Sequence, residues 1–167
     1  GFGIILGLLS HLFIAQSAMG QCGNSSFQHN LDTLSGLQSP LGARMTMAAA
    51  FDDGGYLTVG EIAHPDTPFS FLSRFALWDC QGNLVRVDTI MPQIINRTYA
   101  ATTLGDSGFA VSGFMLNDMQ DSAMGFVARY NRQGDFVAHH QWTSPGKRFI
   151  YYNDIRHVPG VGILAAG

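Results

Sequence analysis

Gly55-Tyr56-Leu57-Thr58-Val59-Gly60 and Gly108-Phe109-Ala110-Val111-Ser112-Gly113 are two versions of one sequence pattern, placed about 53 residues apart. A third version, Gly162-Ile163-Leu164-Ala165-Ala166-Gly167, follows at a similar interval. Each has a glycine at both ends and mostly apolar or small residues between them. Because a unit of this length seldom buries its apolar face alone, the repeat predicts stacked neighbouring units. It identifies an architecture before it identifies a function.

A small apolar strand and a tight turn precede each of the first two segments. The turns are Asp52-Asp53-Gly54-Gly55 and Gly105-Asp106-Ser107-Gly108. Glycine reaches positive φ at little cost, and aspartate accepts local backbone hydrogen bonds, so both turns predict a β-hairpin. We therefore assign the aspartates of these turns a structural role and not a catalytic one. The predicted first strands are 47–51 and 99–104.

A second pair of matching turns divides the rest of each repeat. Asp79-Cys80-Gln81-Gly82-Asn83 and Asn131-Arg132-Gln133-Gly134-Asp135 keep Asp or Asn at the start and Gly at the fourth position. In such a turn the Asx side chain caps the backbone and glycine takes the left-handed conformation. The predicted third strands are 71–78 and 125–130, and the predicted fourth strands are 84–90 and 136–142.

Four antiparallel strands in chain order form a meander, and meanders repeated at this interval are typical of a β-propeller. Ala and Thr in the predicted first strands fit inner strands that crowd around a central axis. A β-sandwich of eight short strands explains the strand count but not the repeated turns. We therefore predict an all-β fold, a β-propeller fragment built of four-stranded antiparallel meander repeats of about 53 residues.

The expected domain organisation has three parts. Residues 1–20 predict a secretory signal peptide, because a short, interrupted apolar run ends in Ala18 and Gly20 before Gln21. Residues 21–43 predict an N-terminal lead. Residues 44–167 predict a partial propeller, with one blade over 44–96, a second over 97–146 and a half blade over 147–167. Propellers need about four to eight blades, so we expect an N-terminal fragment of a longer protein.

Composition excludes several classes of function. A net charge of −3, with 13% charged residues, gives no electrostatic footprint for nucleic acid. No membrane span is expected once the signal is removed. Cys22 and Cys80 are too few for a disulfide framework, and both a bridge between them and two free thiols remain open. These features predict a secreted or cell-surface protein.

The repeat also resembles a known family. The pattern Asp-x-Gly-Gly-aromatic-x-x-x-Gly, followed by Asp/Asn-x-x-Gly-Asn/Asp-apolar, is similar to the long propeller repeats of secreted Bacteroidetes-type proteins. The match covers 45–142 and restarts at 155. It departs from the family where a lysine is common before the second turn, at Leu77-Trp78 and Arg129-Tyr130. Such proteins often end in a sorting domain for the type IX secretion system, so the resemblance implies export by that route.

Candidate binding residues come from the loops that differ between the repeats. In a four-stranded meander, the connections between strands two and three and between blades emerge on one face, and here they are the longer, variable ones. Variable loops on a rigid scaffold are common places for binding. The alternative for each candidate is an ordinary solvated loop residue with no binding role. The candidates are His64, Asp66, Arg97, Asp118, Asp121 and Arg148.

No metal, cofactor or catalytic site is predicted. His139 and His140 are neighbours on a strand and point to opposite faces, so both cannot ligate one ion. Asp118 and Asp121 lie in no dense calcium-binding loop. The chain also has no nucleophile elbow, phosphate loop or paired-histidine zinc motif.

Two functional hypotheses follow. The first is a secreted or cell-surface propeller that acts as a scaffold or binding module for carbohydrate or protein, with no catalysis of its own. The alternative is a propeller enzyme, such as a lyase, glycoside hydrolase or quinoprotein-like oxidoreductase, with its site in blades outside this chain. Acidic, His or Arg residues at matching inner-strand ends of several blades would favour the enzyme.

Overall fold

The computed structural model describes residues 44–63, 71–92, 94–116, 122–144, 146 and 149–167. Every regular element within these residues is a β-strand, which confirms the predicted all-β class. The strands are β1 (Arg44–Ala50), β2 (Tyr56–Ala63), β3 (Phe71–Trp78), β4 (Leu84–Thr89), β5 (Asn96–Thr103), β6 (Phe109–Leu116), β7 (Ala123–Tyr130), β8 (Phe136–Trp142), β9 (Asp154–Val158) and β10 (Gly162–Ala166).

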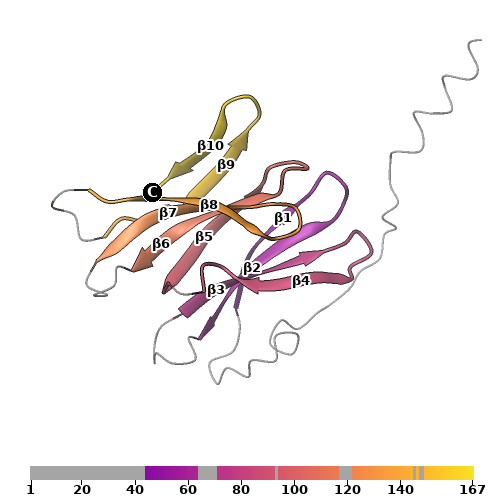
Figure 1. Cartoon of the computed structure of the whole chain (residues 1–167), viewed down its shortest axis with the longest axis horizontal. Coiled ribbons are helices and arrows are strands. Elements are labelled where there is room, and N and C mark those ends of the chain that lie inside the picture. Colours follow the sequence, from indigo (N-terminus) through magenta and orange to yellow (C-terminus); the bar gives the residue numbers. More distant parts are fainter. Residues whose placement is uncertain (1–43, 64–70, 93, 117–121, 145, 147–148) are drawn as a thin grey trace, which may run out of the picture.

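The strands form three antiparallel sheets that follow one another through the molecule (Figure 1). The first two have four strands each, in the orders β1-β2-β3-β4 and β5-β6-β7-β8, and the third pairs β9 with β10. The first strands of the sheets are neighbours, because β1 contacts β5 and β5 contacts β9. The four-stranded antiparallel meander is thus confirmed twice. The described strands do not close into the ring that defines a propeller.

The turns between the third and fourth strands have the predicted geometry. The Asp79 side chain accepts a hydrogen bond from the backbone N–H of Asn83 at 2.8 Å, and Gly82 has a φ of 85°. In the second sheet the Asn131 side chain takes the same role, and Gly134 has a φ of 88°. These local contacts reverse the direction of the chain within five residues and place the fourth strand of each sheet beside the third.

A β-bulge explains the closing glycine of the repeated segment. Tyr99 is the extra residue of β5, inserted after Thr98, which pairs with Gly113 of β6. A Cβ atom on Gly113 would collide with the carbonyl oxygen of Arg97. The first sheet has a matching bulge in β1, beside the pairing of Met45 with Gly60. The glycine is therefore required by a close backbone approach, and the repeated segment has a structural role.

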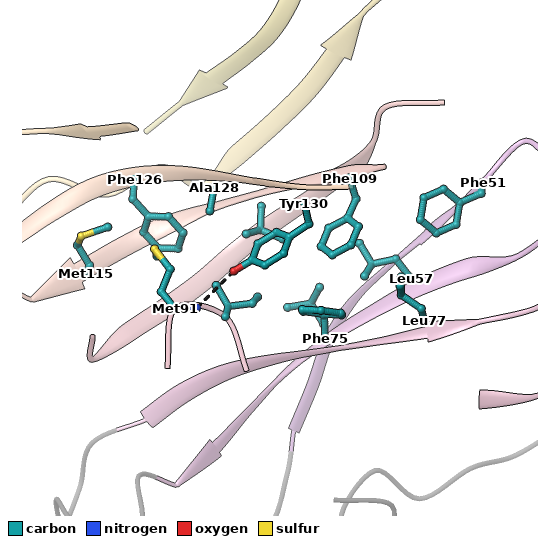
Figure 2. Close-up of a cluster of buried hydrophobic side chains, with 13 residues drawn as sticks. Phe51, Leu57, Phe75, Leu77, Met91, Phe109, Met115, Phe126, Ala128 and Tyr130 are labelled. Carbon is teal, nitrogen blue, oxygen red and sulfur yellow. Dashed lines mark hydrogen bonds between the residues drawn. The ribbon is translucent and has the colours of Figure 1, made fainter. Parts of the chain in front are cut away.

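The main core lies between the facing surfaces of the two four-stranded sheets (Figure 2). The ring of Phe75 in β3 lies 5.1 Å from that of Phe109 in β6, and Phe109 stacks on Tyr130 with ring centroids 5.0 Å apart. Full burial of a side chain of this size contributes about 1.5–3 kcal/mol. The opposite face of the second sheet packs on the third through a smaller cluster of Leu104, Ala110, Val127 and Ile155.

The small residues of the first strands allow direct contact between sheets. The Thr103 hydroxyl of β5 donates a hydrogen bond to the carbonyl oxygen of Ala50 in β1 at 3.0 Å. Nearby, the backbone N–H of Thr98 donates to the Ser73 hydroxyl of β3 at 2.8 Å. Both hydrogen bonds join β5 to the first sheet.

Residues 1–43 lie outside the described part, so the signal peptide and the N-terminal lead stay predictions. The same holds for any bridge from Cys22 to Cys80. Across the described residues, no helix has the length and apolar character needed to cross a membrane.

Candidate functional site

Arg97 is the one sequence-predicted candidate that falls within the described residues. It lies near the start of β5, at the end of the first strands where the variable loops were predicted to emerge. The structure therefore does not test whether the six candidates come together. The other five, His64, Asp66, Asp118, Asp121 and Arg148, lie outside the described ranges.

Arg97 forms a two-pronged ion pair with Glu61 of β2. Arg97 Nε lies 2.6 Å from Glu61 Oε1, and Nη2 lies 3.0 Å from Oε2. The Glu61 side chain is only 6% exposed, whereas that of Arg97 is 36% exposed. The hydrogen bonds to Glu61 raise the pKa of Arg97. A buried carboxylate thus orients a guanidinium whose outer side still faces solvent.

Aromatic rings extend from Arg97 over the first two sheets to the segment before β9. The guanidinium carbon lies 5.6 Å from the ring centre of Phe71 and 5.9 Å from that of Tyr99. Tyr99 in turn lies 5.8 Å from Phe114 and 6.2 Å from Tyr151. We call Phe71, Tyr99, Phe114 and Tyr151 the aromatic row. Two of its rings are open to solvent, since Tyr99 is 37% and Tyr151 47% exposed.

The bulge in β5 explains how Tyr99 enters this row. A bulge leaves one residue out of the pairing ladder and turns its side chain away from the regular alternation. The corresponding extra residue of β1 is Thr46, so the aromatic ring is not part of the repeated pattern. The sequence offered no direct signal for the row, because its members come from separate strands and from the segment before β9.

A second concave feature lies between the two four-stranded sheets. A groove of about 490 Å³ separates β4 from β8 and includes part of the connector from β4 to β5. We call it the inter-sheet groove. Its apolar lining comes from Met91, Pro92, Ile94, Tyr130 and Phe136. Apolar concave surfaces with a few polar groups are the usual form of binding sites.

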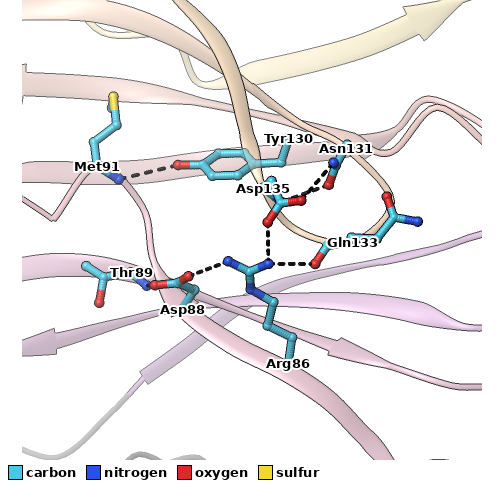
Figure 3. A network of polar contacts seen from close by, with 8 residues as sticks. All are labelled: Arg86, Asp88, Thr89, Met91, Tyr130, Asn131, Gln133 and Asp135. Carbon is cyan, nitrogen blue, oxygen red and sulfur yellow. Dashed lines mark hydrogen bonds and ion pairs between the residues drawn. The ribbon is translucent and has the colours of Figure 1, made fainter.

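Charged groups bind one another along the rim of the groove (Figure 3). Arg86 Nη1 lies 2.7 Å from Asp135 Oδ1, and Arg86 Nη2 lies 2.8 Å from Asp88 Oδ2. Arg86 also donates to the carbonyl oxygen of Gln133 at 3.0 Å. The hydrogen bonds from Arg86 and then from Asn131 lower the pKa of Asp135. Within this network one guanidinium faces two carboxylates, and Arg74 adds a further positive charge close to Asp88.

The connector beside the groove is held in a strained conformation. Met91 is a non-glycine residue with a φ of 44°, which is uncommon outside turns and functional sites. Its backbone N–H donates to the Tyr130 hydroxyl at 3.3 Å. Burial raises the pKa of Tyr130 to about 12.

The histidines of β8 support no metal site. His139 pairs with Ala128 and His140 with Val127, and these two partners belong to the clusters on opposite faces of the second sheet. Both histidines are exposed. Within the described ranges, no group of three or more His, Cys, Asp or Glu residues is arranged to hold a metal ion.

The turn aspartates also behave as predicted, with one addition. Asp53 accepts a hydrogen bond from the backbone N–H of Gly55 at 2.9 Å, which caps the first hairpin. It also pairs with Arg132 of the second sheet at 2.8 Å, a contact that the sequence did not reveal. Arg132 lies over the ring of Phe51 at 3.8 Å. Asp53 therefore joins two sheets as well as closing a turn.

Comparison with known proteins adds no family assignment. Neither a scan against protein-family models nor a search of curated proteins found a match to this chain.

Proposed function

We propose that this chain is a binding module from a secreted or cell-surface β-propeller, and that it holds a carbohydrate chain on the aromatic row without catalysing a reaction. The two repeated meanders and the adjacent first strands support the propeller. The similarity of the turn patterns to the long repeats of secreted Bacteroidetes-type propellers supports export.

The observation that carries the proposal is the exposed row of rings beside an oriented ion pair. A sugar ring has an apolar C–H face, which packs on an aromatic face, and hydroxyl groups at its edge. Tyr99 and Tyr151 offer solvent-exposed rings with polar hydroxyl ends. Arg97 has five N–H donors, of which Glu61 uses two, so further donors can reach sugar hydroxyls.

The geometry gives less support to catalysis. The most buried carboxylate at this face, Glu61, is already bound by Arg97 through both oxygens. A general acid or base must reach the proton that it transfers, and the Glu61 side chain is only 6% exposed and holds a guanidinium through both oxygens. In a binding role, Glu61 holds Arg97 in a fixed position, where the remaining N–H groups of Arg97 can donate to a ligand.

Isothermal titration with xylohexaose, cellohexaose and chitohexaose tests this proposal. We expect at least one of these sugars to bind, and Tyr151→Ala to weaken that binding about 2- to 12-fold, because a ring contact contributes about 0.5–1.5 kcal/mol. Leu164→Ala is the control, since Leu164 is 54% exposed and lies outside the row. Failure of all three sugars to bind, or equal losses in the two variants, would refute a carbohydrate site on the row.

A further inference from the structure

Among the described strands, β8 is an edge strand with an unusual composition. It is the outermost strand of its sheet, and all seven residues of Phe136–Trp142 are exposed. None of them is Asp, Glu, Lys or Arg. Its counterpart β4 is also an edge strand, but it carries Arg86 and Asp88. Proteins commonly protect edges with charge, because an uncharged edge offers unpaired backbone N–H and C=O groups to another chain.

The regular part of this edge lies beyond a bulge. The pairing of β7 with β8 shifts at Val137, and from Ala138 to Trp142 the register is continuous. Bulges also discourage edge pairing, so the available stretch is 138–142. A stretch of this length matches a short strand of a partner chain.

The inter-sheet groove reaches that stretch at His139 and continues past the bulge to Phe136. Phe136 and His139 of β8 line it together with the strained Met91 connector. Phe136 is 51% exposed, so one side of its ring is available to a bound side chain. The rim network nearby places two carboxylates, Asp88 and Asp135, around Arg86.

We propose that β8 and the inter-sheet groove together bind an extended segment of another protein. The segment pairs its backbone with the 138–142 edge and places an apolar side chain in the groove. A basic side chain of the segment lies toward Asp88 and Asp135. This site is separate from the aromatic row and goes beyond the proposed carbohydrate binding.

The chemistry of the edge selects a polypeptide over other ligands. An edge strand presents alternating donors and acceptors, and an extended backbone satisfies both at the spacing of a strand. Successive side chains of the added strand then point to opposite faces of the sheet, so every second one can face the groove. The exposed carboxylate of Asp135 gives the same segment a preferred charge.

Selection from a phage-displayed library of linear dodecapeptides tests this inference. The enriched peptides are synthesised, and binding to the whole chain is measured by fluorescence anisotropy. We expect apolar, alternating peptides with a Lys or Arg. Phe136→Ala should weaken their binding about tenfold. Leu84→Ala is the matched control, because Leu84 of β4 pairs with Trp78 as Phe136 of β8 pairs with Tyr130, and Leu84 does not line the groove. Leu84→Ala should leave binding unchanged.

Backbone methylation then distinguishes strand pairing from simple apolar contact. Two versions of the enriched peptide carry N-methyl groups on alternate residues, in opposite phases. Pairing on β8 predicts that one phase loses at least tenfold in affinity and that the other binds normally, because only every second N–H faces β8.

Three results would overturn the inference. They are the absence of enriched peptides, equal effects of the two methylation phases, and binding that Phe136→Ala leaves intact. A reversible dimer in sedimentation velocity that Phe136→Ala abolishes would instead assign the edge to a second copy of this chain. None of these results depends on sugar binding, so the two proposals fail separately.

Discussion

Gly113→Ala is the sharpest test of the reasoning about the repeated segment. The added methyl group would collide with the carbonyl oxygen of Arg97, and it would also lie 2.9 Å from the carbonyl carbon of Arg97 and 3.0 Å from the Cα of Thr98. All three atoms belong to paired backbone, so no side chain can rotate away. Overpacking typically costs about 1–3 kcal/mol, and a backbone obstacle places this change near 3 kcal/mol. For a chain of this size that corresponds to a fall in Tm of roughly 6–12 °C.

Gly160→Ala provides the matched control. Gly160 has a φ of 77°, but no atom lies within 4 Å of a Cβ placed there. Its substitution therefore costs only the conformational strain, about 1 kcal/mol. Urea unfolding followed by tryptophan fluorescence compares the two variants with the parent. If Gly113→Ala proved no more destabilising than Gly160→Ala, the close approach at the bulge could not be the reason for the repeated glycine.

Three further predictions concern the turns and the connector. Gly134→Val should lower stability by at least about 1 kcal/mol in circular dichroism melts, because a β-branched residue resists a φ of 88° and its Cβ would lie 3.0 Å from an aromatic carbon; an unchanged melt would contradict the turn assignment. The hydrogen bond from Arg132 lowers the pKa of Asp53 below 3.8, so its stabilisation is present above that pH and is lost as the pH falls through the folded-state pKa. Asp53→Asn should therefore reduce the drop in urea midpoint between pH 5 and pH 2, and an equal drop in both proteins would count against this pairing. Tyr130→Phe should cost about 1–3 kcal/mol, because it leaves the N–H of Met91 without its acceptor; a neutral result in urea unfolding would show that this hydrogen bond is dispensable.

The sequence predicted the features that depend on neighbouring residues. The turn glycines were recognisable because residue type and spacing in the turns indicate where a positive φ is needed. Gly82 and Gly134 have the positive φ that this pattern predicts. The order of strands followed from the same turns. The predicted first strand 99–104 begins three residues earlier in the structure, at Asn96, because the bulge at Tyr99 interrupts the regular pattern without ending the strand.

The contacts between sheets could not be predicted in this way. Arg97 was chosen as a candidate from its place near a variable loop, yet the sequence did not show that Glu61, 36 residues earlier, would bind it. The pairing of Arg86 with Asp135 spans 49 residues. Such pairs depend on how two sheets stack, and the sequence around either partner does not indicate which residue the other partner is.

The meander topology has a consequence for synthesis of the chain. Strand pairing within each sheet joins only neighbours in sequence, so the first sheet can form once β4 has left the ribosome. Its apolar side chains, including Phe75 and Leu77, are covered only after β7 is made, about 41 residues later. At about 5–20 residues per second this interval lasts roughly 2–8 s. During that time the nascent chain exposes a finished sheet with an uncovered apolar face, which is the period when a chaperone would have most to bind.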